Sequence, residues 1–205
     1  MTLVSTALGY VIGLPLGVTL AVTGKGGIRE NKVVYRILDV ISNVIRSIPF
    51  LILLILIIPL TRFLVGKSYG SSATIVPLVI AAAPFIARMV ESSLQEVDEG
   101  VIEAAKSMGA GTRTIIFRVL LVEARTSLIV GVTIALGTIL GYSAMAGVVG
   151  GGGLGDIAIR YGYYRYQTDI MVVTIVILVL IVQVLQALGM MLSNWQTNLS
   201  VITCP

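Results

Sequence analysis

This 205-residue chain contains no histidine and a single cysteine, Cys204, and only 12% of its residues are charged. The absence of histidine excludes histidine metal sites, serine–histidine nucleophilic pairs and histidine proton relays. A single cysteine allows no disulfide within the chain. Charge is scarce and 57% of the residues are hydrophobic. We therefore predict a polytopic membrane protein, because a soluble domain could not bury that much apolar surface.

Five apolar segments are long enough to cross a hydrocarbon core, which takes about 20 residues each. They are expected over residues 1–23, 36–60, 72–92, 124–148 and 169–192 of a single domain, 1–205. Pro49 lies inside the second segment, and Pro77 and Pro84 split the third, which suggests kinks that line a cavity. The sequence thus predicts an all-α membrane protein with five transmembrane helices.

Basic residues are distributed unevenly between the loops. Those after the first and third segments hold Lys25, Arg29, Lys32, Lys106, Arg113 and Arg118, whereas the opposite side holds Arg62, Lys67, Arg160 and Arg165. Because cytoplasmic loops are enriched in Lys and Arg, we expect the N-terminus outside and the C-terminus in the cytoplasm. No basic stripe stands free of the apolar segments, so the lipid bilayer is an expected partner and nucleic acid is not.

The loop over residues 93–123 is polar and amphipathic, and glycines interrupt it. Helical character is expected over 95–107, and Gly-Ala-Gly at 109–111 then ends that helix. Thr112 is expected to cap a second helix over 113–123. The pattern predicts a helix–turn–helix at the membrane face, a docking element for a soluble partner. The plain alternative is an ordinary amphipathic interfacial loop.

Within this loop, Glu103, Ala104, Ala105 and Gly109 form the pattern E-A-A-x-x-x-G. The two alanines would let another surface pack closely, and Glu103 supplies a charge or a cap. The pattern resembles the signature of the permease subunits of binding-protein-dependent ABC importers. Val122 stands where that family has a proline, which bears only on the local entry into a helix.

Three further blocks resemble the permease of the bacterial methionine importer. They are NVIRSIPFLILL (43–54), IVPLVIAAAPFIARMVESSL (75–94) and GYSAMAGVVGGGGLGDIAIRYGY (141–163). The resemblance implies a type I importer permease that works as a homodimer with two ATPase subunits and an extracytoplasmic binding protein, a lipoprotein. It implies that residues 103–109 dock on the ATPase, which binds ATP and Mg. The chain itself has no GxxxxGK[ST] loop and is expected to be non-catalytic, with no cofactor.

The cargo path is expected near Tyr142, Ser143 and Met145 on the fourth span and Pro84 on the third. Met145 is flexible and apolar, so it could close a gate against its symmetry mate, although ordinary packing is an equal alternative. An apolar gate suits a small amino acid better than a sugar, and the resemblance implies that the cargo is methionine. A permease for another small amino acid or a short peptide is the alternative within this class.

The glycine-rich segment 150–153 lies at the outer end of the fourth span and is expected to be a flexible external loop. The alternative is a contact with the binding protein through Gly152, Tyr161 and Tyr163, since tyrosine favours interfaces. Tyrosine is also common at membrane boundaries.

Two arginines fall within the apolar segments. Arg46 is expected near the cytoplasmic end of its span, where it would snorkel or form a helix-end ion pair. Arg88 and Glu91, three residues apart on one helix face, are expected to pair. A self-contained secondary transporter or channel, the alternative from another class, would normally need an ionisable relay or a repeat fold, and neither is visible. An intramembrane hydrolase is a remote third alternative, because the chain has no histidine to act as the usual general base.

Small residues recur at four-residue spacing on two spans: Gly9, Gly13 and Gly17 on the first, and Gly137 and Gly141 on the fourth. Such faces let helices approach closely. The spacing leaves open whether the contact lies within one chain or across a dimer.

Overall fold

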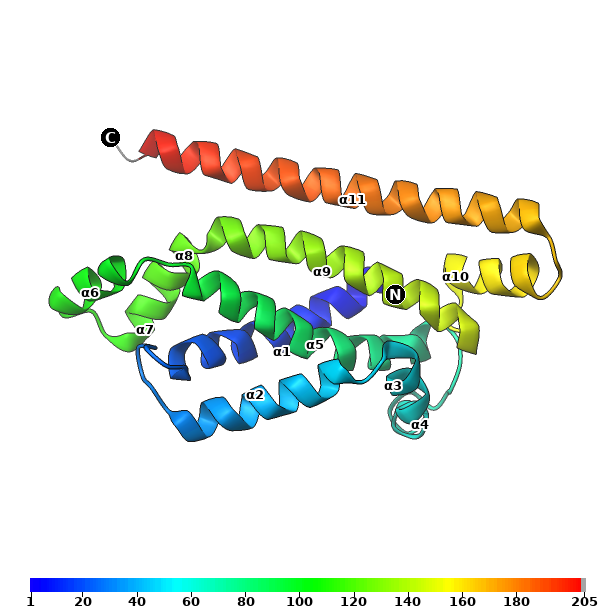
Figure 1. Ribbon diagram of the computed structural model, residues 1–205, viewed down its shortest axis with the longest axis horizontal. Coiled ribbons are helices and arrows are strands. Elements are labelled where there is room, and N and C mark those ends of the chain that lie inside the picture. Colours follow the sequence, from blue (N-terminus) through cyan, green and yellow to red (C-terminus); the bar gives the residue numbers. More distant parts are fainter. Residues whose placement is uncertain (204–205) are drawn as a thin grey trace.

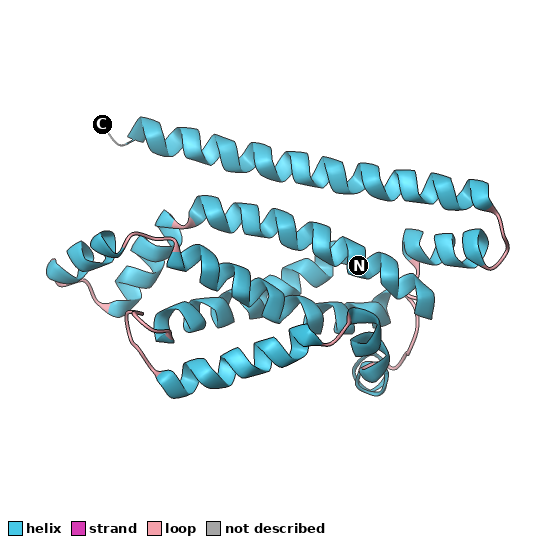
Figure 2. Ribbon diagram, viewed as in Figure 1, coloured by secondary structure: helices cyan, strands magenta, loops and turns pink. Residues whose placement is uncertain are grey.

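The computed structural model describes the backbone of residues 1–203 and the side chains of residues 1–195; Cys204 lies outside the described residues. Within them every element is a helix (Figure 2). The long helices are α1 (Thr2–Thr23), α2 (Lys32–Ser47), α5 (Ser71–Gln95), α9 (Arg125–Met145) and α11 (Thr168–Thr203). The shorter ones are α3 (Phe50–Leu56), α4 (Ile58–Val65), α6 (Glu99–Ser107), α7 (Thr112–Thr114), η1 (Ile115–Leu120), α8 (Leu121–Glu123), η2 (Ala146–Val149), α10 (Gly153–Ile157) and η3 (Ala158–Tyr163).

The long helices run back and forth between two ends of the molecule (Figure 1). The loop between α1 and α2, the helices α6 to α8 and the end of α11 lie at one end. The helices α3, α4 and α10 lie at the other. Among the described residues, four helical segments are long and apolar enough to span a membrane, and the bent pair α2 and α3 makes a fifth when it is counted as one span. The predicted all-helical fold with five spans is confirmed.

The second span is broken, whereas one span over 36–60 was expected. Helix α2 begins at an Asn31 cap, whose side chain accepts hydrogen bonds from the backbone N–H groups of Val33 and Val34. It ends before Ile48, and α3 continues at an angle of 101°. The cause is Pro49, because a residue that precedes proline is driven into extended backbone, as Ile48 is here.

Helix α5 is the centre of the bundle and contacts α1, α2 and α9. The prediction that Pro77 and Pro84 split this segment was wrong, since α5 is a single helix through both. Both prolines are buried, and packing against neighbouring helices lets a membrane helix tolerate them. Leu78 and Ile86 of α5 are fully buried in the core.

The glycines of α1 pack against α5 of the same chain, which decides the question that their spacing left open. A Cβ at Gly13 would lie 2.8 Å from the backbone oxygen of Ala83, and one at Gly17 would lie 2.5 Å from that of Ala87. These approaches are closer than van der Waals contact allows. The two helices can therefore meet only where α1 has no side chain.

We expect Gly17→Ala to lower the stability of the bundle by about 1–3 kcal/mol, the usual cost of overpacking. The measurement is the thermal unfolding midpoint of the detergent-purified protein. Gly137→Ala is the matched control, because a Cβ there meets only the side-chain nitrogen of Gln186 at 3.6 Å. Equal midpoints for the two variants would contradict the close α1–α5 contact.

Candidate functional site

Helix α6 is a short, well-capped helix. At its start the carboxylate of Asp98 accepts a hydrogen bond from the backbone N–H of Gly100, at 2.7 Å. At its end Gly109 adopts a left-handed conformation, with φ +80°. The N–H of Gly109 donates to the carbonyl of Lys106, and the N–H of Ala110 donates to that of Ala105. These two bonds form a Schellman motif, which requires a left-handed residue and thus favours glycine.

The face of α6 that carries Ala105 packs into its own chain. Ala105 is buried in the same cluster as Ile115 and Leu120, and Ile102 and Ala110 pack against that cluster. The interpretation that Ala105 offers a surface to a partner was therefore wrong. A small side chain is needed here because the following helix crosses closely over it. Helices α6 to α8, residues 99–123, thus form one packed unit, which we call the elbow.

The second half of the elbow differs from the predicted helix. Gly111, not Thr112, is the N-cap: its backbone is extended, with φ −69° and ψ 158°, and Thr112 is already helical. Helix α7 then passes into the π-helical turn η1 and into α8. The break between α5 and α6 was also missed, since 95–107 was expected to be one helix. The residues that break it, 96–98, form a turn that Asp98 ends as the N-cap of α6.

The outward face of the elbow carries large exposed apolar side chains among charged ones. Met108 is 82% exposed and Phe117 is 67% exposed. Glu103 and Ala104 are exposed beside them on α6. Exposed apolar residues next to charged ones are typical of a surface that another protein covers. The sequence did not single out Phe117, because its helical spacing alone does not show which side of the elbow faces inward.

A small cavity lies where α2, α3, α5 and α9 meet. Its volume is about 210 Å³, and it is lined by Ile45, Arg46, Ile48, Phe50, Leu53, Ala81, Phe85 and Tyr142. The rings of Phe50 and Tyr142 stack with their centroids 4.6 Å apart and their planes 6° from parallel. The cavity therefore has aromatic and aliphatic walls, and one cation, Arg46, belongs to its lining.

A groove of about 310 Å³ continues from this cavity toward the elbow end. The two share Arg46 and Phe85, and the groove is further lined by Arg88, Met89, Ser92, Ser93, Glu96, Ser127, Val130, Gly131 and Ile134. Residues 81, 85, 89, 92 and 96 of α5 recur at helical spacing along this surface. The cavity and groove together form a path along one side of α5. Of the residues predicted from the sequence to line such a path, only Tyr142 does so.

The four residues predicted to line the path do not all reach it. Tyr142 lines the cavity, whereas Ser143 is buried against α1, where Thr2 donates a hydrogen bond to its hydroxyl at 3.3 Å. Pro84 is buried, and it lines neither the cavity nor the groove. Because each helical residue turns by about 100°, Pro84 points away from the face that carries Phe85. Met145 is 48% exposed and stays a predicted gate.

Arg88 joins α2 to α5 at the side of the groove. Its guanidinium forms ion pairs with Glu91, at 2.6 Å, and with Asp39 of α2. It also donates to the side-chain oxygen of Asn43, at 3.1 Å. The predicted Arg88–Glu91 pair is confirmed, but the pairing with Asp39 was not foreseen, since it links residues 49 positions apart.

The end of the molecule opposite the elbow carries the glycine-rich segment and the tyrosines. The segment 150–153 is a built turn, not the flexible loop that was expected: the N–H of Gly151 donates to Ala146, and the N–H of Gly70 donates to the carbonyl of Gly150. Gly152 is left-handed, with φ +76°. Tyr163 is exposed. The glycine-rich segment is thus a hydrogen-bonded turn, and Tyr163 ends the helix η3 that follows α10.

Tyr161 is partly buried, and the guanidinium of Arg165 lies 4.7 Å above the centre of its ring. Tyr163 and Tyr164 pack edge to face, with their centroids 5.3 Å apart. Of the predicted binding-protein contacts, Tyr163 offers the most open ring. Its exposed neighbours Tyr164 and Tyr166 extend the same aromatic surface.

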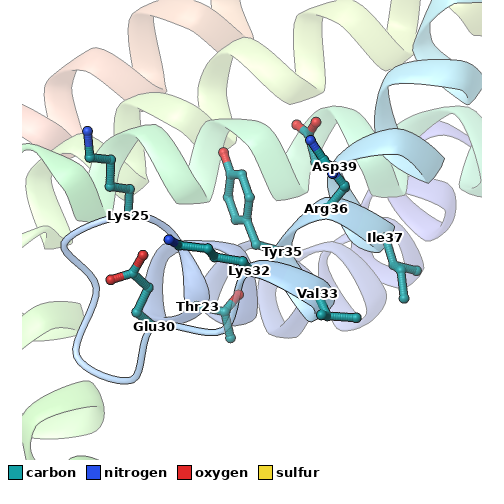
Figure 3. A pocket seen from close by; sticks show the side chains of 9 residues that line it. All are labelled: Thr23, Lys25, Glu30, Lys32, Val33, Tyr35, Arg36, Ile37 and Asp39. Atoms are coloured by element: carbon teal, nitrogen blue, oxygen red, sulfur yellow. The ribbon is translucent and has the colours of Figure 1, made fainter.

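At the elbow end, an open pocket of about 570 Å³ lies beside the α1–α2 loop (Figure 3). Lys25, Lys32 and Arg36 line it together with Glu30, and Figure 3 shows these side chains around the loop. Cationic side chains at a membrane face attract anionic lipid headgroups. The pocket is shallow and charged, and it lies apart from the path, so we assign it no part in transport.

Comparison with known proteins gives consistent similarities. Residues 13–196 match the family model described as binding-protein-dependent transport system inner membrane component. The D-methionine transport system permease protein MetI of Escherichia coli is 54% identical over 72% of this chain and 68% of its own length. The methionine import system permease protein MetP of Bacillus subtilis is 47% identical, over 85% and 79% respectively.

The fold is also similar to that of a solved structure. A chain from the inward facing conformations of the MetNI methionine ABC transporter superposes with a TM-score of 0.94 at 49% sequence identity. The match covers 96% of this chain and 91% of that chain. The likeness therefore extends over the elbow, the groove and the opposite end alike.

Proposed function

Because this chain belongs to the family of binding-protein-dependent transport system inner membrane components, we propose that it is the permease subunit of an ATP-driven importer for methionine. The observation that carries the proposal is the agreement with the permease fold of a methionine ABC transporter, with a TM-score of 0.94 at 49% identity. Relatives named for methionine transport support the same cargo.

In the proposed assembly two copies of the chain form the pore and two separate ATPase subunits bind ATP and Mg. The elbow is the surface that the ATPase would hold, through Glu103, Ala104 and the exposed Met108 and Phe117. Ala105 and Gly109 act indirectly, because they fix the elbow as a packed unit. Closure of the ATPase pair would then move the elbow as a rigid body and open the path alternately to the two sides.

The cytoplasmic (inner) membrane is the proposed location, with the elbow in the cytoplasm. The elbow end carries the α1–α2 loop and most of the loop lysines and arginines, which supports this orientation by the positive-inside rule. The end that carries Gly152 and Tyr163 then faces outside. There an extracytoplasmic substrate-binding protein, a lipoprotein, would deliver methionine onto the exposed tyrosines.

Uptake by proteoliposomes tests this proposal. We expect the chain, reconstituted with its ATPase and binding protein, to accumulate radiolabelled methionine only when ATP is present on the elbow side. Competition by unlabelled D- and L-amino acids then gives the cargo preference. Accumulation of a different amino acid would replace methionine as the cargo, and vectorial uptake by this chain alone would indicate a secondary transporter.

A further inference from the structure

We infer that Arg46 binds the α-carboxylate of the transported amino acid, while the cargo side chain occupies the aromatic cavity beside it. This inference rests on the proposed import function. It adds the residue within the membrane that recognises the cargo, and the ion pair by which it does so. The site would take a small zwitterion with an apolar side chain.

The position of Arg46 is the first argument. It lies in the last turn of α2, at the break before α3. Fourteen residues separate it from Lys32 at the start of α2, which is about 21 Å of helix. Since a hydrocarbon core is about 30 Å thick, Arg46 lies too deep to snorkel easily to the elbow end.

The lack of a partner is the second argument. Within the described side chains, no carboxylate forms an ion pair or a hydrogen bond with Arg46. Arg88 forms ion pairs with Asp39 and Glu91, and Glu96, which lines the same groove, forms no ion pair with Arg46. Asp39 also lies seven residues before Arg46 on α2, about 10 Å along its axis. An arginine within a membrane is costly unless it faces water or a counter-charge, so this one calls for an anionic ligand.

The shape of the adjoining cavity is the third argument. Its volume of about 210 Å³ lies below the range of about 300–1,000 Å³ of drug-sized ligands, so it suits an amino acid. Phe50, Phe85 and Tyr142 supply aromatic faces, and sulfur makes favourable contacts with aromatic rings. A guanidinium is planar and binds a carboxylate with two parallel hydrogen bonds. The cavity thus offers complementary groups for both ends of methionine.

Protection of a reporter thiol tests the inference. Cys204→Ser removes the only native cysteine, and Ala81→Cys places a thiol on the cavity wall. In the purified permease–ATPase complex without binding protein, we expect methionine to slow the reaction of this thiol with a small maleimide. Methioninamide, which has no carboxylate, should protect poorly.

Arg46→Met should raise the methionine concentration for half-protection by about tenfold or more, the scale of a lost charge-assisted hydrogen bond. Arg46→Lys keeps the charge and should retain part of the protection. Phe63→Met, a change on an exposed residue of α4, is the matched control. Equal protection of the Arg46→Met and parent proteins, or none in the parent, would overturn the inference.

Failure of this inference can be distinguished from failure of the proposed import function. If the parent proteoliposomes take up methionine but the thiol shows no Arg46-dependent protection, only this inference fails. If the parent takes up no methionine, the proposed cargo itself fails. Because Arg46→Lys preserves the charge, a folding defect confined to Arg46→Met would still leave the inference testable by the lysine variant and by methioninamide.

Discussion

Gly109→Thr is expected to reduce ATP-driven uptake by about tenfold or more while ATP hydrolysis continues. The backbone at Gly109 has φ +80°, a conformation that a β-branched residue rarely adopts and that costs roughly 1–2 kcal/mol for a residue with a Cβ. Relief of that strain would break the two Schellman hydrogen bonds that end α6. Helix α6 would then turn relative to η1, and the elbow would no longer transmit the motion of the ATPase.

The control for this prediction lies two residues away. Gly111 has φ −69° and no atom within 4 Å of an added Cβ, and threonine is an acceptable N-cap, so Gly111→Thr should keep near-normal uptake. Gly109→Asn should also be tolerated better, because asparagine adopts left-handed backbone more readily. Uptake and ATPase rates measured on the same proteoliposomes show whether ATP hydrolysis has become uncoupled from uptake. Unchanged uptake by Gly109→Thr would count against the elbow as the coupling element.

Arg88→Met is expected to destabilise the protein by about 3–5 kcal/mol, since removal of Arg88 leaves the buried carboxylate of Glu91 without a counter-charge. The side chains of Glu91 and Asp39 are 5% and 31% exposed, and both depend on the Arg88 guanidinium. Thermal unfolding in detergent should show a large fall in midpoint. The folded fraction recovered after purification should fall with it.

A rescue and a control sharpen this second prediction. Arg88→Met combined with Asp39→Asn and Glu91→Gln removes the stranded charges, so it should recover most of the lost stability. Arg160→Met removes an ion pair with Asp156 in which the Arg160 side chain is 58% exposed. That change should cost no more than about 1 kcal/mol. If Arg88→Met and Arg160→Met unfolded at the same temperature, the ion pairs of Arg88 would stabilise the fold no more than an exposed ion pair does.

Patterns among residues close together in the sequence predicted the helical fold, the end of α6 and one ion pair. The helical fold followed from apolar length. The end of α6 followed from Gly109 and the Arg88–Glu91 pair from their spacing. Pro49 was visible as well, but its effect was underestimated: a proline in a hydrophobic run can kink a helix or end it. The choice depends on what packs around the freed backbone groups, as the continuous α5 shows at Pro77.

The sequence by itself determined the number of spans, the polar element between the third and fourth, and the family resemblance carried by Glu103 to Gly109. These depend on the hydropathy, spacing and backbone preference of neighbouring residues. Only the tertiary structure decided that Ala105 faces inward, that Asp39 meets Arg88 and that Arg46, beside an aromatic cavity, pairs with no carboxylate among the described side chains. Helical spacing tells which residues share a face, but the face that is covered depends on helices far away in the chain.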